Sequence, residues 1–284
     1  MQIASAVRWP RCNRVRLVKL SLMDRSGEAM HSEVLKDDPT RPVVRVGNTV
    51  RRAVGWWTPA VHRLLAGLEG IGFAASPRVL DIDEQGREVL SYIDGESGVA
   101  GWAKITPDDG LRRFARLLRD YHDATRDLSI GDDARWALVD GAPKRNEVIC
   151  HTDFAPWNIV WRDAIPVGIL DWDFAGPAPP MNDVAYALDY AIPFRDDETC
   201  IRWHGFEEAP DRKRRIAIFA DAYGLDSTTG LVDAVIERLR LDDLYVRRLA
   251  ARNLEPQATW VRTGQVTESI DRIPWIEQNR HLLE

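Results

Sequence analysis

The sequence predicts an α+β fold in which a small, β-rich part precedes a larger, mainly helical part. Residues 41–93 alternate short strand-like runs with a single helix, whereas apolar residues from 106 to 252 recur mostly at helical spacing. No internal repeat indicates a solenoid or a propeller. We therefore expect an appended, poorly ordered N-terminal extension over residues 1–40, a small lobe over 41–93 and a helical lobe over 94–284.

Two strand pairs and one helix are expected in the small lobe. Residues 42–53 predict two strands that meet at Gly47, because Gly-Asn is typical of a two-residue hairpin turn. A helix should begin at Thr58, with proline in its first turn and apolar residues on one face. Two more strands are expected over residues 78–83 and 88–93.

Helix-start signals and apolar stripes define the helical lobe. Thr106, Pro107 and Asp108 mark one helix start, and an apolar stripe follows. His122 falls at the end of that helix, where a structural role is more common than a catalytic one. Further helices are expected over residues 183–192, 213–223, 230–252 and 275–283, with loops over 98–104 and 176–180.

One stretch in the middle of the chain combines acidic and amide side chains with two β-rich runs. The runs, 158–162 and 166–170, predict a hairpin with a three-residue connection. Asn158 is the first residue of the first run, and Asp171 directly follows the second run. In an antiparallel hairpin these two residues would lie side by side. Both would then face the loop that carries Asp153.

Phosphoryl transfer from a nucleotide requires these residue types. A carboxylate orients the acceptor hydroxyl, and an Asn and an Asp hold Mg²⁺ against the phosphates. Asp153 has the place of the first group, and Asn158 and Asp171 have the place of the other two. The alternative is a surface hairpin with acidic ends, which would account for any one of these acids alone.

The pattern His151-x-Asp153-x-x-x-x-Asn158, followed by a strand that ends in Asp171-Trp-Asp173, resembles the signature of aminoglycoside phosphotransferases. The wider family includes choline, homoserine, fructosamine and methylthioribose kinases. The resemblance implies a two-lobed, protein-kinase-like fold, with Asp153 as the catalytic base and His151 as a brace of the catalytic loop. The other residues that it implies are the Mg²⁺ ligands Asn158, Asp171 and Asp173, and Asp183 as structural support of that loop.

The same resemblance implies a site for ATP, or for GTP, in the small lobe. Backbone groups of Ser91, Tyr92 and Ile93 would bind the base. Arg51 or Arg52 lies where such kinases have a lysine that holds the phosphates. The guanidinium fork binds phosphate well, although it does not replace a compact ammonium group without consequence.

Three departures from the family pattern are visible. Thr152 stands where glycine is common, no lysine occurs between Lys36 and Lys104, and no glycine occurs between Gly27 and Gly47. The last two concern the small lobe, where glycines allow close approach to phosphates. A non-catalytic pseudokinase that binds a metabolite or a partner is therefore the alternative function.

Length and composition agree with a soluble enzyme. The chain of 284 residues is 45% hydrophobic and 29% charged, with a net charge of −6, which argues against a nucleic-acid partner. No apolar run reaches the length of a membrane span. Three widely spaced cysteines, Cys12, Cys150 and Cys200, form neither a disulfide framework nor a zinc motif, so a cytoplasmic location is expected.

The acceptor is expected to be a small molecule with a hydroxyl group, and two features bear on its charge. One is a set of acids that would suit a cationic amino sugar: Asp189, Asp196, Asp197, Glu198, Glu207 and Glu208. The other is a set of aromatic residues, Tyr190, Trp203 and Trp260, that would suit a quaternary amine. For most of these residues a solvated surface or an ordinary core is the simpler interpretation.

Overall fold

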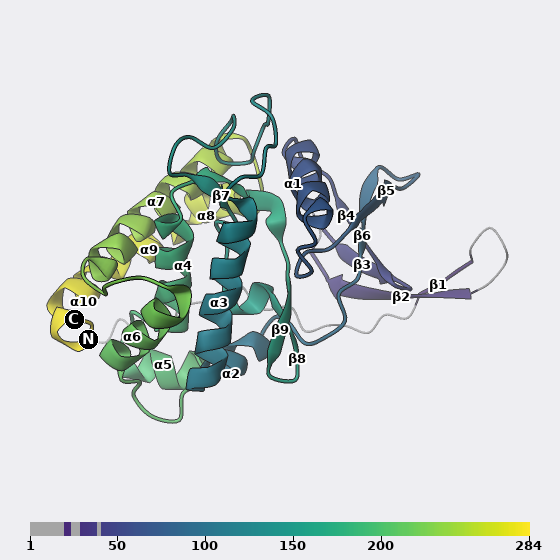
Figure 1. Ribbon diagram of the computed structural model, residues 1–284. Helices are drawn as coiled ribbons and strands as arrows, with labels where there is room; N and C mark the ends of the chain where they lie inside the picture. Colours follow the sequence, from purple (N-terminus) through teal and green to yellow (C-terminus); the bar gives the residue numbers. More distant parts are fainter. Residues whose placement is uncertain (1–19, 24–28, 39–40) are drawn as a thin grey trace. The chain divides into compact units, whose positions relative to one another are not determined.

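The computed structural model describes residues 20–23, 29–38 and 41–284. Contacts divide the chain into two compact units (Figure 1). Among the described residues, the sheet unit consists of those up to Val54 together with Val79–Tyr92, and the helical unit consists of Gly55–Arg78 and Ile93–Glu284. The expected α+β composition, with strands first and helices after them, is confirmed.

The sheet unit is built on a six-stranded antiparallel sheet in the order β1-β2-β3-β4-β6-β5. At the turn between β3 and β4, Gly47 has a φ of +59°, which glycine adopts without steric cost. Val46 pairs with Thr49 across this turn, so the expected two-residue hairpin is confirmed. The strands are β1 (Leu20–Met23), β2 (Ala29–Lys36), β3 (Val43–Val46), β4 (Thr49–Ala53), β5 (Val79–Ile82) and β6 (Arg87–Ser91).

The grouping of contacts differs in two places from the expected lobes. Much of the expected extension, residues 1–19, 24–28 and 39–40, lies outside the described residues. Its described part forms β1 and β2, which continue the sheet instead of standing apart from it. The helix α1 (Thr58–Gly70) groups with the helical unit, because Trp57 just before it bonds to Asp173. The division into lobes itself stays a prediction.

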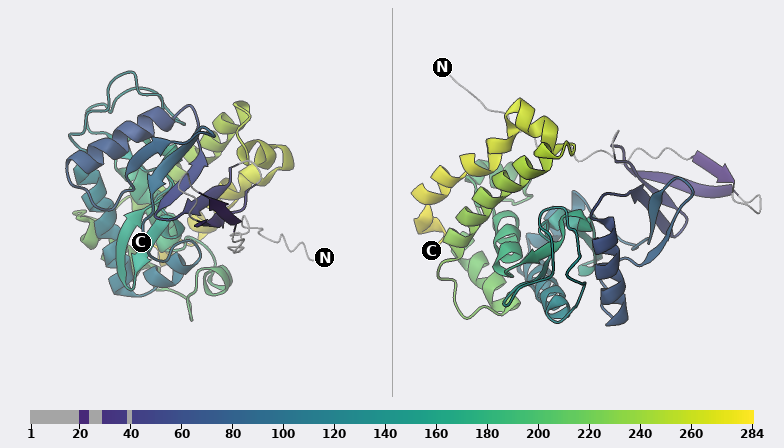
Figure 2. Two further views of the ribbon diagram at one scale, coloured as in Figure 1. Left: turned by 90° about the vertical axis from the view of Figure 1, so that its right-hand side faces the viewer. Right: turned by 90° about the horizontal axis from the view of Figure 1, so that it is seen from above.

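The helical unit packs around the long helix α3, which contacts α6 and the short strands β7 and β9 (Figure 1). The helix α7 packs on α4 and α8 (Figure 2). The helices are α2 (Ala100–Ile105), α3 (Asp108–Thr125), α4 (Met181–Ala191), α5 (Asp197–Trp203), α6 (Arg212–Tyr223), α7 (Leu231–Ala251), α8 (Gln257–Thr263), α9 (Glu268–Asp271) and α10 (Ile273–Gln278). The strands are β7 (Val148–Cys150), β8 (Ile159–Arg162), β9 (Ile165–Ile169) and β10 (Gly176–Ala178), and the 3₁₀ turns are η1 (Pro156–Asn158), η2 (Trp172–Phe174), η3 (Gln265–Thr267) and η4 (Arg280–Leu282).

Both of the expected loops were wrong in part, for the same physical reason. Residues 98–104 contain most of α2, and a Cβ atom on Gly101 would lie 1.9 Å from the backbone oxygen of Pro156. Residues 176–180 begin with β10, which pairs with β7, and a Cβ atom on Gly176 would meet Val139. In both places glycine allows close packing of a regular element rather than a turn.

The hairpin of β8 and β9 has the expected antiparallel pairing, although its connection has two residues instead of three. Ile159 pairs with Ile169, and the backbone N–H of Leu170 donates to the carbonyl oxygen of Asn158 at 2.8 Å. This register places the residue after β9 next to the residue before β8. The expected return of Asp171 to the side of Asn158 is therefore confirmed.

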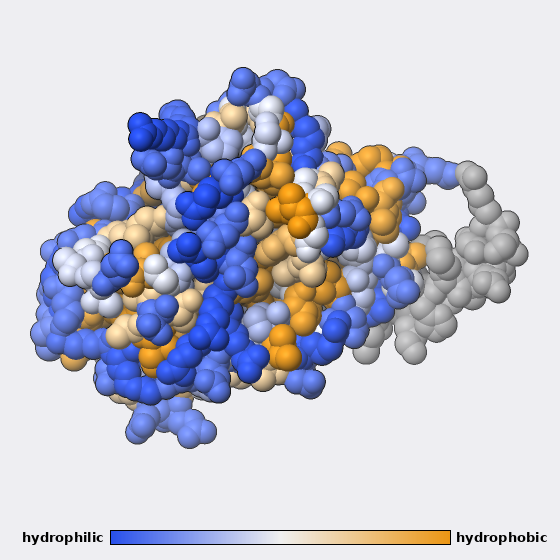
Figure 3. Space-filling view, viewed as in Figure 1, coloured by the Kyte–Doolittle hydropathy of each residue, from blue (hydrophilic) through white to orange (hydrophobic). Residues whose placement is uncertain are grey.

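Hydrophilic side chains cover much of the face of the helical unit that is seen in Figure 3. Within the described part of the chain, no helix has both the length and the apolar character required to cross a membrane.

Candidate active site

The loop between β7 and η1 holds Asp153 between two donors. Its Oδ1 atom accepts a hydrogen bond of 2.6 Å from the hydroxyl of Tyr186, and its Oδ2 atom accepts one of 2.9 Å from Nδ2 of Asn158. The Asn158 amide also donates to the backbone oxygen of Asp153 at 2.9 Å. The structure thus brings together the predicted base and one predicted metal ligand.

Charge is concentrated around Asp153. Burial of the carboxyl group, and next the negative charge of Asp171, raise the pKa of Asp153 to about 7. The hydrogen bonds from Tyr186 and Asn158 act in the opposite direction. The ionised carboxylates of Asp153 and Asp171 repel each other, so a cation bound beside them would be stabilised.

Asp171 and Asp173 have different surroundings although one residue separates them. Asp171 has a φ of +60°, a left-handed conformation that a non-glycine residue rarely adopts. Asp173 is buried, and its Oδ1 atom accepts a hydrogen bond of 3.0 Å from Nε1 of Trp57. We conclude that Asp171 lies beside Asp153. Asp173 instead holds the segment before α1 through its hydrogen bond with Trp57. Their predicted roles as metal ligands stay predictions.

His151 links the loop that carries Asp153 to the end of β9. Its Nε2 atom lies 2.9 Å from the carbonyl oxygen of Leu170, and its Nδ1 atom accepts the N–H of Asp153 at 3.3 Å. Burial is the main reason why the pKa of His151 is lowered, so the ring is neutral with its proton on Nε2. These contacts agree with the predicted bracing role.

Asp183, at the start of α4, holds the same loop from the other side. Its two oxygens accept the backbone N–H groups of His151 at 2.6 Å and Thr152 at 2.7 Å. His122 lies 3.1 Å from Oδ2 and also contacts the hydroxyl of Tyr223 at 2.7 Å. His122 is therefore a buried structural residue, as expected from its place at the helix end.

The threonine that departs from the family pattern is in a strained conformation. Thr152 has a φ of +62°, which is unfavourable for a β-branched residue and explains why glycine suits this position. Its Oγ1 atom bonds to the backbone oxygens of His151 and Phe174. These bonds offset part of the strain, so the departure is compatible with an intact loop.

Two residues near Asp153 were not identified from the sequence. Tyr186 follows Asp183 by one turn of α4, and this helical spacing was the available signal. Arg238 comes from α7, is buried, donates to the backbone oxygen of Thr152 at 2.7 Å, and lies over the ring of Tyr186 at 4.5 Å. No local sequence signal connects Arg238 to a loop 86 residues away.

The predicted nucleotide residues lie on β4, on β6 and just after it. Arg51 pairs with Asp83 at 3.7 Å, and Arg52 pairs with the buried Glu88 of the neighbouring strand at 3.0 Å. Both guanidinium groups are thus held by acids of the sheet unit. The role of Arg51 and Arg52 in binding phosphate stays a prediction.

The predicted base-binding segment Ser91, Tyr92 and Ile93 has an ordered backbone. Ser91 ends β6, and the N–H of Tyr92 donates to the backbone oxygen of Asn48 at 2.9 Å. Ile93 packs against Gly168, where a Cβ atom would lie 2.8 Å from its side chain. Binding of the base by this segment stays a prediction.

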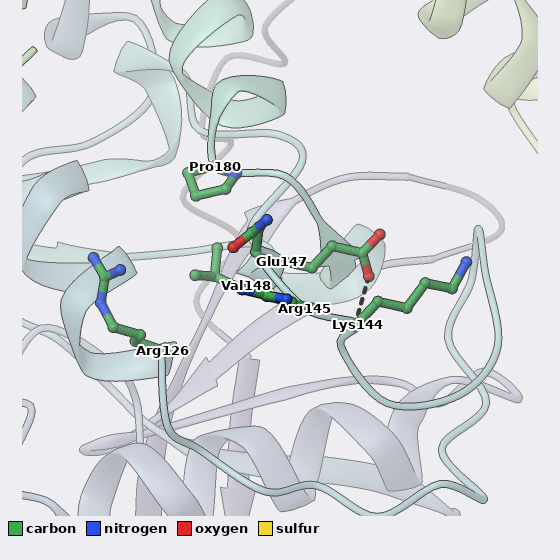
Figure 4. Close-up of a pocket in the computed structure, with 7 residues that line it drawn as sticks. Arg126, Lys144, Arg145, Glu147, Val148 and Pro180 are labelled. Carbon is green, nitrogen blue, oxygen red and sulfur yellow. Dashed lines mark hydrogen bonds between the residues drawn. The ribbon is translucent and has the colours of Figure 1, made fainter.

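A cavity of about 400 Å³ opens at the start of β7 (Figure 4). Its lining includes Arg126, Lys144, Arg145 and Glu147, and none of the predicted site residues. Arg126 is paired with Asp123 at 2.8 Å, and Glu147 accepts the backbone N–H of Lys144 at 2.9 Å. Because no predicted site residue lines this cavity, it is separate from the candidate active site.

Replacement of Asp183 by Asn should lower the free energy of unfolding by about 3–5 kcal/mol at neutral pH, because the variant removes one partner of a buried charged network. Burial alone would raise the pKa of Asp183, but the hydrogen bonds from His122 and from the backbone N–H of His151 keep the pKa of this carboxyl group below its usual value. The ionised carboxylate therefore stabilises the fold above the unfolded-state pKa, and this contribution disappears as the pH falls through the folded-state pKa.

Urea denaturation of the wild type and Asp183→Asn across a pH series measures this effect. The difference between the two proteins should shrink once the pH is below about 4. A matched control is Asp123→Asn, because Asp123 is an exposed neighbour of His122 in surface ion pairs. A difference that stays constant down to low pH would contradict the assigned contribution.

The fold and the loop geometry together define a protein-kinase-like phosphotransferase architecture. A family model described as the phosphotransferase enzyme family matches residues 132–217, which include the loop that carries Asp153, the β8–β9 hairpin and α4. A trifolitoxin immunity protein from Rhizobium leguminosarum bv. trifolii is 35% identical over 201 residues, which cover 68% of this chain and 75% of that protein. The chain belongs to this family of small-molecule kinases, and the expected resemblance is confirmed.

Solved structures show the same fold at low sequence identity. An aminoglycoside phosphotransferase-like protein from Ralstonia eutropha JMP134 has a TM-score of 0.55 at 13% identity, with 89% of this chain and 92% of that chain covered. An ethanolamine kinase from Plasmodium vivax has a TM-score of 0.53 at 12% identity, with 87% and 79% covered. The GDP complex of aminoglycoside 2'-phosphotransferase-IIIa has a TM-score of 0.55 at 14% identity, with 88% and 93% covered. The expected protein-kinase-like fold is thereby confirmed.

Proposed function

We propose that this protein transfers the γ-phosphoryl group of ATP, with Mg²⁺, to a hydroxyl group of a small molecule. The observation that carries the proposal is the arrangement of Asp153 between Asn158 and Tyr186, with Asp171 beside it at the end of β9. A single acid on a surface hairpin would not be hydrogen-bonded by an amide five residues away and placed next to a second acid. GTP is the alternative donor.

The donor set at this corner fits a divalent magnesium ion. The Asn158 amide nitrogen points to Asp153, which leaves its oxygen for another partner, and Asp171 supplies a carboxylate. Hard oxygen ligands from an amide and a carboxylate are those that Mg²⁺ prefers. When bound, Mg²⁺ supplies positive charge that neutralises the phosphate oxygens. Asn158 and Asp171 would hold it, and Asp173 would adjust the position of the segment.

The chain's own residues then prepare the acceptor. Asp153 accepts a hydrogen bond from the acceptor hydroxyl and takes its proton late in the transfer. Asp183 and His151 keep the loop backbone in place, so that the Asp153 carboxylate keeps one position. Positioning of this kind contributes most of the catalysis in phosphoryl transfer, since little covalent chemistry is left to the protein.

Product analysis tests this proposal directly. The protein is incubated with Mg²⁺ and ATP or GTP in the presence of hydroxyl-bearing compounds, and the products are examined by mass spectrometry. We expect an acceptor that gains one phosphate, together with a nucleoside diphosphate. A gain of a whole nucleotide would indicate nucleotidyl transfer, and no transfer to any compound would favour the pseudokinase alternative.

The immunity protein among the relatives supports a second, narrower proposal: that the acceptor is a toxic compound and that phosphorylation inactivates it. A sensitive bacterium that produces the wild-type protein should survive a higher dose of such a compound than one that produces Asp153→Asn. Equal protection by the two proteins would instead indicate that the protein sequesters the compound, as expected of a pseudokinase.

A further inference from the structure

The turn η2 connects Asp171 to β10, and its two end residues are fastened to neighbouring segments. Trp172 donates through Nε1 to the backbone oxygen of Ile169, the last residue of β9, at 2.9 Å. The backbone oxygen of Phe174 accepts a hydrogen bond from the hydroxyl of Thr152. These two contacts hold the backbone of η2 at both ends, so the acids beside and within this turn extend from a defined backbone.

The middle residue of η2, Asp173, is fastened through its side chain. Nε1 of Trp57 donates to Oδ1 of Asp173 at 3.0 Å, and the two residues are buried, with exposed fractions of 2% and 6%. An indole N–H is a donor that cannot accept a hydrogen bond, so the carboxyl oxygen must be the acceptor. Hydrogen bonds to a carboxylate are stronger than those between neutral groups. The Trp57 indole therefore occupies one oxygen of Asp173.

Trp57 has a fixed position because the chain turns tightly around its ring. A Cβ atom on Gly55 would lie 2.5 Å from the indole, so the ring packs directly on the glycine backbone. The ring of Trp56 packs edge-on against it, with ring centres 4.5 Å apart. Thr58 closes the turn, because its hydroxyl accepts the N–H of Gly55 at 2.8 Å and its own N–H donates back at 3.1 Å. The packing of this turn thus holds the indole N–H in place.

One engaged oxygen limits how Asp173 can contribute to a bound cation. A carboxylate can bind a metal ion with one oxygen or with both. Because Oδ1 accepts the indole N–H, Asp173 has at most Oδ2 to offer. Mg²⁺ is small, requires octahedral geometry and keeps several waters, whereas Ca²⁺ takes more oxygen ligands and accepts both oxygens of one carboxylate. A carboxylate restricted to one oxygen therefore suits Mg²⁺ better than Ca²⁺.

We infer that Trp57 is a positioning residue that makes the proposed magnesium site selective for Mg²⁺ over Ca²⁺ by holding Oδ1 of Asp173. The inference rests on the proposed function, in which Asn158 and Asp171 hold the ion, and it assigns the selectivity of that site. Trp57 acts through Asp173 and not by contact with the ion. Without the indole N–H, Asp173 can turn and offer both of its oxygens, which favours the larger ion.

The selectivity is measured on the full chain as a ratio of two dissociation constants for ADP, the one with Ca²⁺ divided by the one with Mg²⁺, by titration calorimetry. In the wild type, ADP should bind more tightly with Mg²⁺. Trp57→Phe keeps a buried aromatic ring and loses the donor, so the ratio should fall about tenfold, as the loss of one hydrogen bond to a charged group supports. An unchanged ratio in Trp57→Phe, or no effect of either ion on the wild type, overturns the inference.

Two further variants separate selectivity from packing. Trp56→Phe removes the neighbouring indole, whose N–H donates to the backbone oxygen of Trp136 at 3.3 Å, and should leave the ratio at its wild-type value. Asp173→Asn has a single side-chain oxygen, so it should weaken binding with both ions and keep the preference for Mg²⁺. An equal fall of the ratio in Trp56→Phe and Trp57→Phe would identify packing as the cause and overturn the inference.

The wild type supplies a test that does not depend on the folding of Trp57→Phe. With isotope-labelled tryptophan, the indole N–H signal of Trp57 in an NMR spectrum reports whether the bond to Asp173 persists. The signal should keep its hydrogen-bonded shift and its slow exchange with solvent deuterium when Mg²⁺ and ADP are added. Loss of both on this addition would show that Oδ1 leaves the indole for the ion, and would overturn the inference.

Two outcomes separate this inference from the proposed function. Phosphate transfer by the wild type, together with an unchanged ratio in Trp57→Phe, would support the kinase and overturn the role of Trp57. A lowered ratio in Trp57→Phe, without transfer of phosphate to any compound by the wild type, would support the role of Trp57 and overturn the proposed transfer.

Discussion

Replacement of Asp153 by asparagine should lower the turnover number for phosphate transfer by about 10²–10⁴-fold, the usual contribution of a positioned general base. The variant keeps the shape of the side chain and an oxygen that can accept a hydrogen bond from Asn158, so the loop should stay folded. It loses the negative charge that orients the acceptor hydroxyl and receives its proton. Nucleotide affinity, measured by titration calorimetry with Mg²⁺ present, should stay close to that of the wild type.

The matched control is Asp163→Asn. Asp163 lies in the turn between β8 and β9, its side chain is exposed, and its φ of +56° is one that asparagine tolerates. Lys104 bonds to the backbone oxygen of Asp163, which the substitution leaves in place. Asp163→Asn should transfer phosphate at the wild-type rate. A wild-type rate in Asp153→Asn as well would show that Asp153 is not the base.

The candidate site could be predicted from the sequence where its geometry depends on local pairing. The β8–β9 hairpin places Asp171 beside Asn158 through the antiparallel pairing that the two β-rich runs already indicate, although its turn is one residue shorter than predicted. The loop with Asp153 and the helix start at Asp183 lie within the same continuous stretch. Because these residues are close in sequence, the arrangement of the central part of the site could be predicted. The fold class could be predicted as well.

The remainder depends on contacts that no local pattern encodes. Arg238 and Tyr223 reach the loop and His122 from helices that are distant in sequence, and only tertiary packing selects them. Gly101 was predicted to lie in a loop. Its lack of a side chain instead allows the close contact between α2 and η1. The helix α2 is also only six residues long, too short for helical periodicity to identify it.

Replacement of Asp171 by asparagine should abolish the Mg²⁺-dependent part of nucleotide binding. Asparagine is chosen because Asp171 has a φ of +60°, and alanine would add about 1–2 kcal/mol of backbone strain to the loss of the ligand. In the wild type, nucleotide at about 100 times its dissociation constant should stabilise the fold by about 2.7 kcal/mol. Thermal unfolding with ATP and GTP, with Mg²⁺ or with a chelator, measures this difference.

Asp163→Asn again serves as the control, since it makes the same substitution at another residue with a positive φ. It should keep the full Mg²⁺-dependent shift, so a loss confined to Asp171→Asn identifies the carboxylate rather than backbone strain as the cause. An undiminished shift in Asp171→Asn would dismiss Asp171 as a metal ligand. No shift in the wild type with either nucleotide would point to the sheet unit, where acids of the same sheet pair with Arg51 and Arg52, and would favour a pseudokinase that binds the acceptor alone.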